Sequence, residues 1–171
     1  VNDLPGVAAR ATIRPAGGEA GASQLVVDTA VEHFGAFATV ANRGSRFAGP
    51  WSAAVGASSS AFTPFGERIE AIFFRSIPQQ EQQFGQVTVE TRVGDEGGRI
   101  RAFLGRGPSN PGFIIKSLDI ESVTTSGGIH FAAPFVRSRG LNIQMDMGFD
   151  FENSRQDNLG LRTTEDRLRV F

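Results

Sequence analysis

The chain has 171 residues, with 17 lysines and arginines against 18 aspartates and glutamates, and it contains no cysteine. Near-balanced charge, with Lys116 as the sole lysine and no basic cluster, argues against a nucleic-acid partner. The missing cysteine excludes disulfides, thiolate zinc sites and a cysteine nucleophile. Twenty-one glycines and fifteen phenylalanines favour many turns between strands that carry aromatic residues. No apolar run reaches the about 18 residues of a membrane-spanning helix.

Residues 1–30 predict a small αββ unit. Val1 to Val7 has the character of a helix end, because Pro5 and Gly6 would stop a helix there. Two short strands are expected at 9–14 and 24–29, and the loop between them is rich in glycine. Such a unit is too small to hold a core of its own.

From about Val31 the pattern changes to strands separated by turns. Apolar and polar residues alternate along several segments, and this period of two is typical of a strand with two different faces. The sequence predicts eight strands, near 33–42, 50–61, 67–77, 83–93, 99–106, 118–134, 140–153 and 167–171.

The clearest alternation runs from Leu141 to Glu152. At roughly 3.3 Å per residue these residues span about 40 Å. A transmembrane β-strand needs about 9–11 residues, whereas an ordinary strand has about 5–6. The stretch is therefore a membrane strand or an unusually long strand of a soluble sheet.

The connections between the predicted strands alternate in length. Short turns are expected at 63–66, 94–98 and 136–139, and longer polar connections near 43–49, 78–82, 107–117 and 154–166. Outer-membrane barrels have short periplasmic turns and longer extracellular loops. This order favours an antiparallel transmembrane β-barrel meander over a soluble sandwich.

The alternation also assigns the side chains of such a barrel to two sides. A soluble sheet would instead place the polar residues on a solvated outer face. The residues expected to face the lumen are Gln86, Thr88, Glu90, Arg92, Arg99, Arg101, Asn142, Gln144, Asp146, Asp150 and Glu152. Those expected to face lipid are Val87, Val89, Val93, Leu141, Ile143, Met145, Met147, Phe149 and Phe151.

The order of several motifs resembles the haemolysin activation/secretion family of two-partner secretion transporters. Asn2 to Val7, Arg14-Pro15 with the glycine-rich loop, and Leu25 to Val27 resemble the end of a second POTRA domain. Asn42 to Gly49 resembles the first outer loop of the barrel. Pro134 to Asn142 resembles the hairpin turn into the strand at 140–153. The resemblance runs over essentially the whole chain.

The resemblance implies an outer-membrane protein with periplasmic POTRA domains and a sixteen-stranded barrel. Residues 1–30 would end a POTRA domain, and residues 31–171 would form the first half of the barrel. The implied function is export of a large secreted exoprotein, such as a haemolysin or adhesin. POTRA modules of this family are thought to capture substrate by strand addition, which makes Leu25, Val26 and Val27 substrate-contact candidates.

No catalytic, cofactor or metal site is expected. The only histidines, His33 and His130, lie on separate strands and fit structural or solvated roles better than catalysis. The acidic turn from Gly94 to Gly98 offers too few carboxylates for a good calcium site, so turn chemistry is the better explanation. Asp146, Asp150 and Glu152 are either an acidic stripe that guides an unfolded substrate or simply solvated lumen residues.

Two other functions remain open from the sequence. One is a small eight-stranded outer-membrane barrel with a structural, adhesive or lipid-modifying role. The other is a soluble β-sheet protein that binds a ligand.

Overall fold

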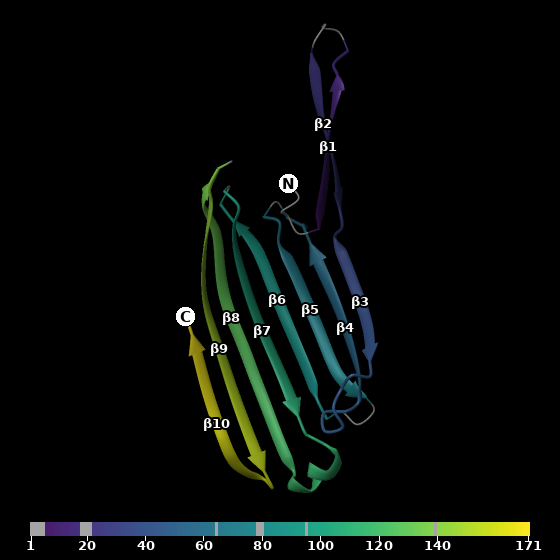
Figure 1. The fold of residues 1–171 in the computed structure, drawn as a ribbon, viewed down its shortest axis with the longest axis vertical. Helices are drawn as coiled ribbons and strands as arrows, with labels where there is room; N and C mark the ends of the chain where they lie inside the picture. Colours follow the sequence, from purple (N-terminus) through teal and green to yellow (C-terminus); the bar gives the residue numbers. More distant parts are fainter. Residues whose placement is uncertain (1–5, 18–21, 64, 78–80, 95, 139) are drawn as a thin grey trace.

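The computed structural model describes residues 6–17, 22–63, 65–77, 81–94, 96–138 and 140–171. Within these ranges the chain is almost entirely antiparallel β-sheet, with one short 3₁₀ helix, η1 (Phe113–Leu118) (Figure 1). The strands are β1 (Val7–Pro15), β2 (Ser23–Val31), β3 (Phe34–Ala41), β4 (Trp51–Ser60), β5 (Arg68–Ile77), β6 (Gln83–Val93), β7 (Gly98–Ser109), β8 (Ile120–Arg137), β9 (Asn142–Asn158) and β10 (Leu161–Val170).

Strands β3 to β10 form one eight-stranded sheet in simple sequential order. Each strand pairs with the next one along the chain, so the prediction of eight antiparallel strands in a meander is confirmed. β3 and β10 lie at opposite edges of this sheet, and in the described part of the chain they do not pair with each other. The sheet is therefore open.

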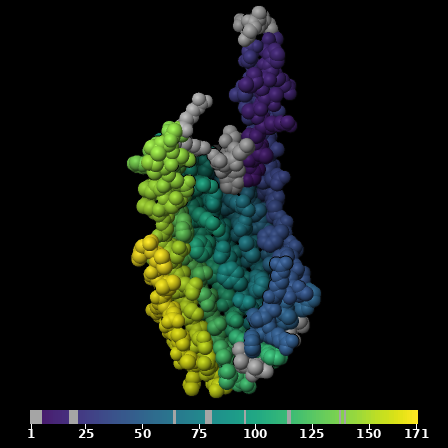
Figure 2. Space-filling model, viewed as in Figure 1, coloured from purple at the N-terminus to yellow at the C-terminus, as the bar shows by residue number. Residues whose placement is uncertain are grey.

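The N-terminal strands form a separate two-stranded hairpin. β1 and β2 pair from Val7↔Val31 to Pro15↔Ser23, which confirms the two strands expected at 9–14 and 24–29. The hairpin projects beyond one end of the large sheet as a finger (Figure 2). The helix end expected at Val1 to Val7 lies largely outside the described residues, so the expected αββ unit is seen only as its two strands.

The prediction of a long loop at 154–166 is wrong. β9 continues to Asn158 and β10 begins at Leu161, so only residues 159–160 connect them. The connection at 61–67 is also longer than the one at 78–82, and strict alternation of short and long connections does not hold. Residues 153–158 lack a period of two because both faces of the strand are polar there, and polarity without alternation suggested a loop.

The register gives the large sheet two chemically different faces. Cα partners on neighbouring strands have their side chains on the same face, so each face can be followed residue by residue from β4 to β9. The apolar face carries, among others, Val55, Phe73, Val87, Leu104, Ile129 and Met147. The polar face carries Glu70, Glu90, Arg101, His130, Asp150 and Glu152.

No described part of the chain covers the apolar face. In the described part of the chain no apolar side chain is buried, and Val87 and Leu104 are 49% and 58% exposed. The accessible surface is 12254 Å², whereas a compact protein of this mass would expose about 8,100 Å². The sheet is thus a single layer whose apolar face needs an apolar environment outside the described chain.

The apolar residues form a belt that runs obliquely across the strands. The row Ala57–Ala71–Val87–Leu104–Gly127–Phe151 crosses six strands at right angles. On β9 the apolar residues lie on one side of this row, toward Ile143, whereas on β4 they lie on the other side, toward Trp51. Such an oblique belt would lie parallel to a membrane plane only if the strands were tilted relative to the membrane normal, as barrel strands are.

Several glycines face aromatic rings on neighbouring strands, which is one reason for the high content of both residue types. A Cβ at Gly56 would collide with the ring of Phe37, and one at Gly127 would lie 2.6 Å from the ring of Phe151. An aromatic ring on the neighbouring strand can pack over a glycine and shield backbone that no side chain of the glycine covers. It also explains Phe37, an aromatic residue on the otherwise small and polar surface of β3.

The connection between β4 and β5 is held by one carboxylate. The backbone N–H groups of Phe62 and Thr63 donate to Glu67 Oε1 at 2.7 and 2.8 Å, and the Thr63 hydroxyl donates to Oε2. The Thr63 hydroxyl and these amides lower the pKa of Glu67 below its usual range. Hydrogen bonds to the charged carboxylate cause this direction of shift.

We expect this turn to loosen in acid. A carboxyl with a lowered folded-state pKa stabilises the turn above its unfolded pKa, and the contribution is lost as pH falls through the folded value. Amide exchange at Phe62 and Thr63 should therefore accelerate below about pH 4, beyond its intrinsic pH dependence. Glu67→Gln should show the fast exchange already at neutral pH. Equal protection in both proteins at neutral pH would contradict this role.

Candidate functional site

A band of charged side chains crosses the polar face from β5 to β9. One row of direct partners reads Arg68, Glu90, Arg101 and His130, so charges of opposite sign oppose each other on β5, β6 and β7. Arg68 also forms an ion pair with Glu70 on its own strand, at 2.7 Å. Opposite charges facing each other across strands stabilise pairing, and each pair contributes roughly 0.2–1 kcal/mol.

The band is basic on one side and acidic on the other. Arg92 and Arg99 face each other across β6 and β7, and the same row continues through β8 to Asp146 on β9. Arginines directly opposite each other are unfavourable unless water or a counter-charge lies between them. The polar face therefore requires hydration, and its charge runs from basic at β7 to acidic at β9.

A hollow lies in the middle of this band. It has a volume of about 480 Å³ and is lined by Gln86, Arg101, Phe103, His130 and Asp150. His130 Nε2 lies 2.9 Å from Asp150 Oδ1, and the His130 ring stacks on Phe103 with centroids 6.0 Å apart. The pair is more than 40% exposed on both sides, so its contribution to stability is at most about 1 kcal/mol.

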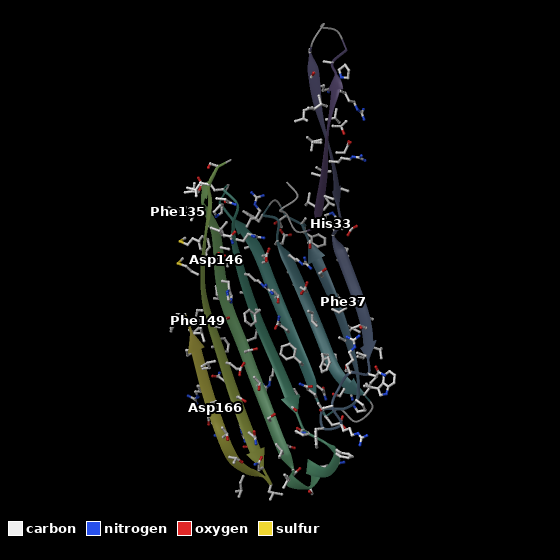
Figure 3. The ribbon with its side chains drawn as sticks, in the orientation of Figure 1. His33, Phe37, Phe135, Asp146, Phe149 and Asp166 are labelled. Carbon is white, nitrogen blue, oxygen red and sulfur yellow. The ribbon has the colours of Figure 1, made fainter. Side chains whose placement is uncertain are left out.

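Two glycines make room for this hollow. A Cβ at Gly148 would lie 2.7 Å from the His130 ring, and one at Gly128 would press against Asp150 and Phe103. The His130 ring therefore lies over Gly148 of the neighbouring strand, β9. Figure 3 labels Asp146 on the same strand. The register between β8 and β9 brings His130 to Asp150.

No group of three or more His, Asp or Glu side chains in the described part could hold a metal ion. The other histidine, His33, donates a hydrogen bond from Nδ1 to the Ser60 carbonyl, 3.1 Å away, and stacks on Phe62. Both histidines thus have structural partners. Asp95 of the acidic turn lies outside the described residues.

The predicted division into two sets of side chains agrees with the register. The set expected to face lipid lies on the apolar face, except Leu141, which precedes β9 in the turn and bonds Ser138 through its backbone. The set expected to face the lumen lies on the opposite face, with Asn142 at the very start of β9. Phe149 of the first set and Asp146 of the second are labelled in Figure 3.

The hairpin offers a second candidate surface, the free edge of β2. Hydrogen bonds join Ala16 N to the Ala22 carbonyl and Glu32 N to the Gly6 carbonyl. Because hydrogen-bonded pairs alternate in an antiparallel ladder, the pair Thr12↔Val26 is also hydrogen-bonded. The backbone groups of Val26 therefore face β1. Those of its neighbours in sequence, Leu25 and Val27, face the free edge.

Comparison with known protein families, curated proteins and solved structures gives no match. Among the described residues, no helix has the length and apolar character needed to cross a bilayer.

Proposed function

We propose that this chain is part of an outer-membrane transporter of the two-partner secretion type, which exports a secreted exoprotein. In this proposal residues 31–171 supply the N-terminal half of a β-barrel, and residues 1–30 supply the periplasmic end of a POTRA domain. The partners are outer-membrane lipid on one face of the sheet and an extended polypeptide on the other.

The observation that carries the proposal is the uncovered apolar belt on a single-layer sheet. In water such a face, with unpaired strands at both edges, would aggregate. Contact with lipid would cover this face without aggregation, and the oblique course of the belt fits tilted strands. A soluble ligand-binding sheet would need a second layer, and the described chain supplies none.

The polar face suits the passage of an extended chain. Its arginines on β6 and β7 and its carboxylates on β9 require a wet environment, which a wide lumen provides. Hydrated charges of both signs contact a polypeptide weakly at many points and bind no single sequence tightly. Strand addition at the free edge of β2 would supply the first contact, because backbone hydrogen bonds tolerate varied sequences.

The membrane part of the proposal predicts the behaviour of this chain in detergent. We expect the refolded chain to enter the detergent-rich phase in a phase-separation experiment. A chain that stays in the aqueous phase as a folded monomer would contradict the proposal, and it would favour the soluble β-sheet alternative.

The open edges predict that this chain by itself forms no porin-like channel. We expect planar bilayers containing the reconstituted chain to show no stable conductance of porin size, because β3 and β10 need further strands to close a barrel. A stable open pore formed by single chains would overturn this prediction. It would favour the small eight-stranded barrel instead.

A further inference from the structure

A second charged region lies on the apolar face itself, just beyond the border of the belt on the side of the C-terminal end of β9. On β9 the apolar row ends at Phe151, and the next residues on this face are Asn153, Arg155 and Asp157. A hollow of about 310 Å³ lies over them, and β7, β8 and β10 also line it. Lipid would not cover these polar groups, so this surface lies where a bilayer would meet water.

The arginines in this region are arranged by distance from the belt. The first polar row reads Arg106, Thr125, Asn153 and Arg167 from β7 to β10. Arg169 lies one row closer to the belt, with its guanidinium 5.6 Å from the centroid of the Phe151 ring. The charged residues at the border of the belt on these strands are therefore all arginines.

The acidic residues of the region lie farther from the belt. Glu165, Asp157 and Glu121 occupy the next rows. Glu165 binds Arg167 at 2.6 Å and Arg162 at 3.0 Å, and Asp157 binds Arg155 at 2.6 Å. On this face there are thus five arginines and three carboxylates, and a fourth carboxylate, Asp166, lines the hollow from the other face of β10.

Two of the arginines have no carboxylate partner among the described residues. The Arg106 side chain makes no ion pair or hydrogen bond there, and it is exposed. Arg169 donates only to uncharged acceptors, which are Asn153 Oδ1 at 2.9 Å and two backbone carbonyls. Uncompensated positive charge thus remains at the border of the belt.

An apolar groove starts at the same arginine. It has a volume of about 510 Å³, and Val55, Phe73, Val87 and Leu104 line it, with Arg106 among its lining residues. The groove exists because Gly85 carries no side chain there; a Cβ at Gly85 would meet only Phe73, at 3.8 Å. Arg106 therefore belongs both to the apolar groove and to the polar hollow.

From this arrangement we infer a binding site for a phosphorylated membrane lipid, with its acyl chain in the Gly85 groove and its headgroup phosphate in the polar hollow. There the phosphate would contact the unpaired Arg106 and also Arg167, which it would share with Glu165. The inference rests on the proposed membrane location. Arginine pairs with phosphate through charge-assisted hydrogen bonds. Cations beside a bilayer attract anionic lipid. The bound lipid would fix the depth of these strands in the membrane.

The test measures the affinity of the chain for phosphatidylglycerol in micelles of a zwitterionic detergent, with phosphatidylcholine as the neutral comparison. Arg106→Gln with Arg167→Gln should weaken phosphatidylglycerol binding by more than fivefold, since an unpaired arginine near a membrane surface contributes about fivefold and Arg167, which Glu165 partly neutralises, adds less. Arg99→Gln with Arg101→Gln removes the same charge from the polar face and should change the affinity less than twofold. Equal losses in the two double variants would overturn the site.

A second pair of variants tests the acyl groove. Gly85→Leu fills the groove and should weaken binding of long-chain phosphatidylglycerol, whereas Ala102→Leu on the same face, outside the groove, should not. Unchanged binding by Gly85→Leu would overturn the lipid assignment, as would complete displacement of the lipid by millimolar inorganic phosphate.

The outcomes also separate this inference from the proposed function. Equal affinity for phosphatidylglycerol and phosphatidylcholine would overturn the lipid site and leave the membrane location standing. A folded chain that binds neither lipid would overturn both.

Discussion

An arginine at Val87 should prevent stable insertion of the sheet into a bilayer. Val87 lies in the middle of the apolar belt, between Ala71 and Leu104 on the neighbouring strands. An arginine at the midplane of a lipid-facing barrel surface costs about 2–4 kcal/mol. We expect Val87→Arg to lower the free energy of unfolding in lipid vesicles by an amount in this range, measured by denaturant titration.

The neighbouring position supplies the control. Gln86 precedes Val87 on β6 and lies on the polar face, beside the hollow that contains His130 and Asp150. Gln86→Arg therefore adds the same side chain where water is expected, and the unfolding free energy should change by less than about 1 kcal/mol. If the two variants were equally stable in vesicles, the apolar face would not contact lipid.

The sequence predicted the sheet well where the two faces of a strand differ. From β4 to the first part of β9, alternation reflects apolar surroundings on one side and water on the other, so the period of two identifies the strands. This condition fails beyond Phe151. There the end of β9 and the start of β10 carry polar residues on both faces, and only pairing between the strands, which a single segment does not reveal, shows that they are extended.

Strand β10 illustrates the same limit at the sheet edge. Its apolar residues Leu168 and Val170 lie on the polar face, opposite Glu152 and Asp150, whereas Arg167 and Arg169 lie on the apolar face. Alternation correctly predicted a strand at 167–171. It did not reveal that the two faces are exchanged there, because the face of a strand follows from its register with the neighbour.

The candidate sites depend on register even more strongly. Odd and even positions along a strand point to opposite faces, and the predicted polar and apolar sets follow from this alternation. The alternation does not specify which residues meet across strands, so the contact of His130 with Asp150 was not predicted. The convergence of Arg106, Arg167 and the Gly85 groove was missed for the same reason, since these residues come from three different strands.

Proline substitutions at Val26 and Val27 should have opposite effects on the β1–β2 hairpin. Val26 donates to the ladder with Thr12, so Val26→Pro removes a hydrogen bond worth about 1 kcal/mol from a two-stranded unit that is marginally stable. We expect amide protection in β1 to be lost. The Val27 amide faces the free edge, so Val27→Pro should leave the hairpin intact.

The same pair of variants tests substrate capture. Strand addition at β2 requires the free amides of Leu25 and Val27, so Val27→Pro should abolish capture of an unfolded polypeptide although the hairpin persists. A photo-reactive side chain at Ser23, beside this edge, would report capture as a cross-linked product. Undiminished cross-linking to Val27→Pro would show that the polypeptide binds elsewhere. Full amide protection in Val26→Pro would instead contradict the hydrogen-bonding register itself.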